Sequence, residues 1–81
     1  MVYPLEIAVS GQYAFVTSNN GNDTRPDSVF TIDLGILEVV KINPVGLLPS
    51  GLAYDSENDL LYTSNFFSRN ITRLSLAELL P

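Results

Sequence analysis

The sequence contains no cysteine, no histidine and no tryptophan among its 81 residues. Without cysteine there is no disulfide framework and no thiolate chemistry. Because histidine is absent too, the chain cannot form a Ser-His-Asp or Cys-His catalytic arrangement, and it lacks the imidazole and thiolate ligands that hold zinc or haem iron. The lack of tryptophan removes the usual aromatic platform for sugars. We therefore predict no catalytic residue, no cofactor and no metal site.

Basic residues are also scarce, since four lysines and arginines stand against nine aspartates and glutamates, for a net charge of -5 at pH 7. They form no run along the chain, so the phosphate neutralisation that nucleic-acid binding requires is missing. No apolar run is long enough to cross a bilayer. Met1–Pro4 have neither the basic nor the apolar part of a signal peptide, so none is predicted in this stretch. We expect neither nucleic acid nor membrane insertion.

Apolar residues, in contrast, are abundant. They make up 46% of the chain, while charged residues account for only 16%, below the usual quarter. A domain of this size leaves a large share of its surface exposed after folding. The composition therefore predicts apolar faces that meet a partner.

Three segments recur in the chain in the same order. Pro4–Val9 returns as Pro49–Tyr54 at an offset of 45, Phe15–Ser18 as Tyr62–Asn65 at 47, and Ser28–Leu34 as Asn70–Leu76 at 42. A period in the forties built from short apolar segments is typical of a β-propeller, in which four-stranded sheets, or blades, repeat around an axis. The second segment also aligns at an offset of 46, and that one-residue slip would exchange the two faces of the strand.

Residues that favour strands, bounded by turn residues, predict seven strands in two successive sheets. They are Leu5–Ser10, Tyr13–Ser18, Ser28–Leu34 and Glu38–Asn43, followed by Gly51–Asp55, Leu60–Asn65 and Asn70–Leu76. Apolar pairs within the strands indicate sheets that are covered on both faces. A small β-sandwich or meander is the alternative fold. At the tail, Leu76–Leu80 favour a short helix as an alternative to extended chain.

Five motifs fall in order along the chain and carry a resemblance to a known family. They are Ile7–Ser10, Phe15–Thr17, Ile32–Leu34, Val39-Val40 and Pro44–Gly51. Their order and spacing resemble the YVTN-type β-propeller repeat of surface-layer-like proteins. The resemblance implies about two blades, with residues 1–48 as the first blade and its crossover and residues 49–81 as a second, incomplete blade. The resemblance also favours the offset of 47 for Phe15–Ser18, and it implies an extracytoplasmic location.

Seven strands do not close a propeller, because closed propellers usually carry four to eight blades. We therefore expect either a segment of a longer propeller or a subunit that forms a ring, with three copies giving six blades and four giving eight. The expected partners are further propeller blades or copies of this chain, with a protein or a carbohydrate as candidate ligand.

Two places offer candidate binding residues. Glu6 stands near the start of the innermost strand, where the resembled family has glycine and the second repeat has Gly51. The polar loop of residues 19–27 contributes four more candidates: Asn22, Asp23, Arg25 and Asp27. We expect this loop and the crossover between the blades to share one end of the propeller with Glu6. The alternatives are a solvated strand end and a solvated loop. The loop oxygens suit calcium, but the EF-hand spacing is missing.

Taken together, these features predict a non-enzymatic binding or interaction module of the β-propeller type. One alternative is part of a propeller enzyme, such as a metal-dependent lactonase-like hydrolase or an oxidoreductase, whose catalytic residues would lie in other blades. The other alternative is a two-blade lectin-like oligomer.

Overall fold

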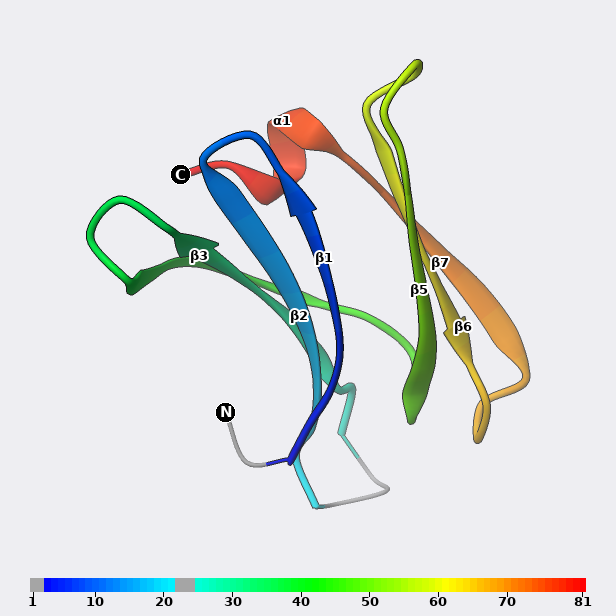
Figure 1. Cartoon of the computed structure of the whole chain (residues 1–81). Helices are drawn as coiled ribbons and strands as arrows, with labels where there is room; N and C mark the ends of the chain where they lie inside the picture. Colours follow the sequence, from blue (N-terminus) through cyan, green and yellow to red (C-terminus); the bar gives the residue numbers. More distant parts are fainter. Residues whose placement is uncertain (1–2, 22–24) are drawn as a thin grey trace.

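The structure of the chain is a computed structural model that describes residues 3–21 and 25–81. Its elements in chain order are β1 (Tyr3–Ser10), β2 (Tyr13–Asn19), β3 (Ser28–Asp33), β4 (Glu38–Pro44), β5 (Pro49–Asp55), β6 (Leu60–Asn65), β7 (Asn70–Ser75) and α1 (Leu76–Leu79). The strands form two open antiparallel sheets, β1-β2-β3-β4 and β5-β6-β7 (Figure 1). The prediction of an all-β chain is confirmed, and each strand lies within two residues of its predicted bounds.

Each hairpin turn contains a residue with positive φ. The two-residue turn between β1 and β2 uses Gly11, with a φ of 57°, as tight hairpins require. The hairpins that follow β3, β5 and β6 instead place a residue other than glycine in the left-handed region: Leu37, Asp59 and Arg69 respectively. Neighbouring strands therefore follow one another as simple meanders within each sheet.

The two sheets share one pairing register. All but one of the Cα pairs of β5-β6-β7 correspond to pairs of β1-β2-β3 after a shift of 45 residues in the first strand, 47 in the second and 42 in the third. The exception is Gly51 with Ser64, which falls in the register shift of the first strand. For example, Ser10 pairs with Tyr13 in the first sheet, and Asp55 pairs with Leu60 in the second. In both sheets the first strand has a register shift near its start. Corresponding residues therefore lie at corresponding positions of the two sheets.

The hydrophobic core lies between the sheets. Its buried members are Phe15 and Val29 from the first sheet, Leu61 and Leu74 from the second, Val45 from the crossover and Leu79 from α1. The ring of Phe15 stacks on that of Tyr54, with 5.7 Å between the ring centroids. The first strands of the two sheets, β1 and β5, also lie against each other (Figure 1). One face of each sheet is thus used to build the core.

The short helix α1 binds the end of the chain to the first sheet. Leu79 is fully buried, and its carbonyl oxygen accepts a hydrogen bond of 2.7 Å from the Thr31 hydroxyl. The Asn43 side-chain amide donates to the carbonyl oxygen of Glu78 at 2.9 Å. The alternative of a short helix at the tail is thereby confirmed, one residue shorter than expected. The helix packs against both β4 and β7 and so bridges the two sheets.

Candidate functional site

The face of the first sheet that is turned away from the core is apolar, and no other part of the described chain covers it. Cross-strand partners lie on the same face of a sheet, so the register assigns to it eight side chains: Ile7, Val9, Ala14, Val16, Phe30, Ile32, Val39 and Ile42. We call this surface the free face. Ile7 and Val9 are 62% and 60% exposed. A soluble monomer rarely exposes so continuous an apolar surface, which indicates an interaction site.

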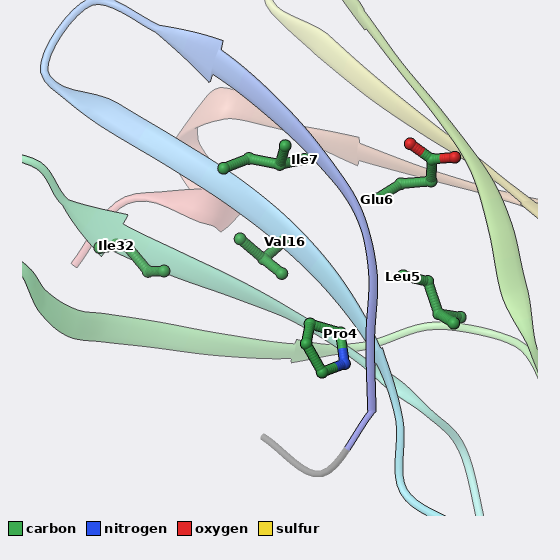
Figure 2. A pocket seen from close by; sticks show the side chains of 6 residues that line it. All are labelled: Pro4, Leu5, Glu6, Ile7, Val16 and Ile32. Atoms are coloured by element: carbon green, nitrogen blue, oxygen red, sulfur yellow. The ribbon is translucent and has the colours of Figure 1, made fainter.

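A depression of about 380 Å³ lies along the β1 side of the free face. It is lined by Pro4, Leu5, Glu6, Ile7, Val16 and Ile32 (Figure 2). All of these residues except Glu6 are apolar. Figure 2 shows that the carboxylate of Glu6 extends from β1 toward β5. The depression therefore suits an apolar side chain of a partner, with one carboxylate at its border.

Glu6 lies in the register shift of β1, where its backbone N–H donates to the Thr17 hydroxyl at 3.1 Å. The corresponding residue of the second sheet is Gly51, whose backbone approaches Ser64 so closely that a Cβ atom would collide with the Ser64 hydroxyl. The second sheet has no room for a side chain at this position, whereas the first sheet holds an exposed one there. This candidate residue is thus a surface carboxylate at the edge strand of the first sheet.

Asp27 is buried, and its carboxylate holds two loops together. It accepts hydrogen bonds from the Asn20 backbone N–H at 2.8 Å, the Asn19 amide at 3.0 Å and the Leu48 backbone N–H at 2.8 Å. Its carbonyl oxygen accepts a further bond from the Val45 N–H at 2.9 Å. The β2–β3 loop and the crossover to β5 therefore do share one end of the molecule. With all these bonds made inside the chain, Asp27 has a structural role.

Arg25 is exposed at the same end and lines a second depression, of about 250 Å³. Its polar neighbours there are Ser68 and Asn70, from the region of the β6–β7 turn. Asn22 and Asp23, the other two loop candidates, lie outside the described residues. The structure thus brings Arg25 and Asp27 to one end of the molecule, while Glu6 lines a different depression.

A buried amide that the sequence did not single out joins β6 to β7 beside the crossover. Asn65 is 2% exposed, and its amide donates to the Asn70 side-chain oxygen and the Thr72 hydroxyl, both at 2.9 Å. Its own oxygen accepts from the Thr63 hydroxyl at 3.0 Å. A Cβ atom on Gly46 would come within 2.6 Å of the Asn65 side chain, so only glycine fits there. An asparagine at the end of a strand gives no local signal for this role, because its amide donates to side chains of the next strand, β7.

The titrating groups whose pKa departs from its ordinary value serve structural contacts. Burial raises the pKa of Tyr54, and the hydrogen bond of 2.9 Å that it donates to Asp59 acts in the same direction. The side-chain hydrogen bond from Asn58 lowers the pKa of Asp55 in the β5–β6 turn. Neither pair offers a nucleophile beside a base.

Within the described residues, no three histidine, cysteine, aspartate or glutamate side chains come together in a way that could hold a metal ion. The same part of the chain contains no helix long and apolar enough to span a membrane. No family model, no curated protein and no solved structure matches the chain. The free face is therefore the feature of the molecule from which a function can be argued.

Proposed function

We propose that the chain is a non-enzymatic interaction module of the β-propeller type, in which the two sheets are consecutive blades related to the YVTN-type repeat. The simple strand order of each sheet supports this proposal, as does the shared pairing register. So does the contact between β1 and β5, because the first strands of neighbouring blades lie beside one another around a propeller axis. The partners of the module are further blades or copies of itself.

The free face is the observation that carries the proposal. Ala14 and Val16, on the central strand β2, are almost fully buried by their neighbours on the sheet, while Ile7, Val9 and Ile42 around them remain more than half exposed. This surface is apolar and continuous over four strands, as the face of a blade must be if a second sheet is to pack on it. Burial of such side chains drives association in water.

The proposal is tested by a pair of matched substitutions. Ile7 and Ile36 are 62% and 60% exposed, but only Ile7 lies on the free face, since Ile36 belongs to the β3–β4 turn. Ile7→Thr keeps a β-branched side chain in the strand, so folding is preserved. We expect Ile7→Thr to weaken association by about tenfold, because roughly 1.5 kcal/mol of apolar burial is lost. Ile36→Thr should leave association unchanged.

The measurement is sedimentation velocity over a dilution series, with circular dichroism to establish that both variants are folded. Equal sedimentation of Ile7→Thr and Ile36→Thr at every concentration would remove the free face as the interaction surface. A chain that sediments as a monomer throughout would exclude copies of itself as the partner of the free face.

A further inference from the structure

We propose that two copies of the chain associate head to tail. In this arrangement the outer face of β5-β6-β7 of one copy packs on the free face of the next. We call this second surface the far face and define it by Leu60, Tyr62, Ser64, Ile71 and Arg73, which alternate along β6 and β7 with the residues of that sheet that face the core. This inference rests on the proposed function, because it names the partner of the interaction module.

The interface between the two sheets within one chain provides the template. The first sheet contributes the face that contains Phe15 and Val29, and the second contributes the face that contains Tyr54, Leu61 and Leu74. The two packed surfaces are different, so the interface has two distinct sides. Each sheet uses only one of its faces in this contact.

The shared register relates the two uncovered surfaces to these two sides. The free-face residues Val9, Ala14 and Ile32 correspond to Tyr54, Leu61 and Leu74, which are packed in the second sheet. The free face is thus the counterpart of the surface that the second sheet already packs against the first.

The far face corresponds in the same way to the packed face of the first sheet. Tyr62 takes the position of Phe15, and Ile71 takes that of Val29. Ile71 is 69% exposed, and a depression of about 270 Å³ lies beside it and Tyr62 on this sheet. The chain therefore carries both sides of a second interface of the same kind, and neither side is covered by the described residues.

A head-to-tail contact brings the two different surfaces together, whereas a two-fold contact made through one surface alone would pair that surface with itself. Such contacts close into rings when the rotation between neighbours allows it, and otherwise grow into filaments. Three or four copies would supply the six or eight sheets of a closed propeller. The one charged member of the far face, Arg73, takes the position of Thr31. Its aliphatic stem can cover apolar surface while the guanidinium reaches solvent.

The template also predicts which residues meet. Phe15 stacks on Tyr54 within one chain, so Tyr62 of one copy should lie over Val9 of the next. The sequence has no cysteine, which allows a clean test with two single variants, Val9→Cys and Tyr62→Cys. Packed sheets lie about 10 Å apart, too far for a disulfide, so a short bis-maleimide is the suitable cross-linker.

In the experiment, the two folded variants, one of them carrying an affinity tag, are mixed and cross-linked. We expect mixed dimers to exceed dimers of either variant alone by at least tenfold, and the double variant Val9→Cys/Tyr62→Cys to give a ladder or a closed oligomer. A control mixture of Val9→Cys with Ile36→Cys, whose thiol lies in the β3–β4 turn, should give few mixed dimers.

The outcomes separate the two proposals. Predominant dimers of Val9→Cys with itself would overturn the head-to-tail arrangement in favour of a two-fold contact. Association in sedimentation with no preference for mixed dimers would also overturn it, while leaving the interaction module in place. If the chain does not self-associate at all, the inference of a second copy as partner is wrong.

Discussion

At the scale of single residues, the chain shows how a polar loop residue can become part of the interior. Local composition places Asp27 in a solvated loop, and every neighbour in sequence agrees with that expectation. In the structure Asp27 is buried, because the crossover packs over the loop and the Leu48 N–H, 21 residues away in sequence, donates to its carboxylate. A contact of this range leaves no local pattern in the sequence. Glu6, by contrast, is exposed near the start of its strand, as the sequence suggests.

Substitution of Asp27 tests its structural role. Asp27→Ala leaves the backbone N–H groups of Asn20 and Leu48 without their carboxylate acceptor, and hydrogen bonds to charged groups contribute about 1.5–3 kcal/mol each. We expect the free energy of unfolding to fall by about 3 kcal/mol in urea denaturation. The control Glu57→Ala, on an exposed turn, should change it by less than about 0.5 kcal/mol. Similar stability of the two variants would argue against the assignment.

At the scale of elements, the strands are well predicted because their signals are local. Turn residues such as Gly11 punctuate runs rich in residues that favour strands, and these two features determine where hairpins form. The segment that follows the third strand differs between the two sheets: β3 leads into a turn and β4, whereas β7 leads into α1. Asp33 accepts hydrogen bonds from the Gln12 amide and the Gly35 N–H, whereas the corresponding Ser75 caps α1. The replacement of aspartate by serine can be seen in the sequence. The docking of α1 cannot, because it depends on a hydrogen bond from the distant Thr31.

The cap of α1 predicts a dependence of stability on pH. The Glu78 carboxylate accepts from the Ser75 backbone N–H at 3.0 Å, and this bond, together with that from the Ser75 hydroxyl, lowers the pKa of Glu78 below its ordinary value of 4.5. A group with a lowered folded-state pKa contributes stability above its unfolded pKa, and loses it as the pH falls through the folded value. The contribution is therefore complete at neutral pH and disappears in acid.

Glu78→Gln isolates this effect, because glutamine preserves the capping geometry but cannot ionise. We expect the variant to be less stable than the unsubstituted chain at neutral pH. The difference should begin to shrink near the ordinary pKa of 4.5 and vanish once the pH falls below the lowered folded-state pKa of Glu78. Urea unfolding across an acid titration gives the measurement, and Glu57→Gln serves as control. A stability difference that persists unchanged in acid would show that the charge of Glu78 is not the cause.

At the scale of the whole molecule, the order and register of the strands could be predicted from the repeated segments. With the offset of 47, each residue of β6 except Ser64 has a partner on β5 that corresponds to the β1 partner of the matching residue of β2. The apolar composition also anticipates uncovered faces. The sequence does not indicate which face of each sheet packs inside the chain, since apolar residues such as Phe15 and Val16 alternate to both sides of β2. Which face of the first sheet is buried is decided only by its packing against the second sheet.

The most direct test of the account is the molar mass of the unsubstituted chain in solution, measured by multi-angle light scattering across a range of concentrations. If the free face and the far face are the two sides of one interface, as we propose, a chain of 8.9 kDa should not remain alone in solution. We predict an assembly of three or four copies, as expected for six or eight sheets. A cooperatively folded monomer of 8.9 kDa that persists at every concentration would contradict the account.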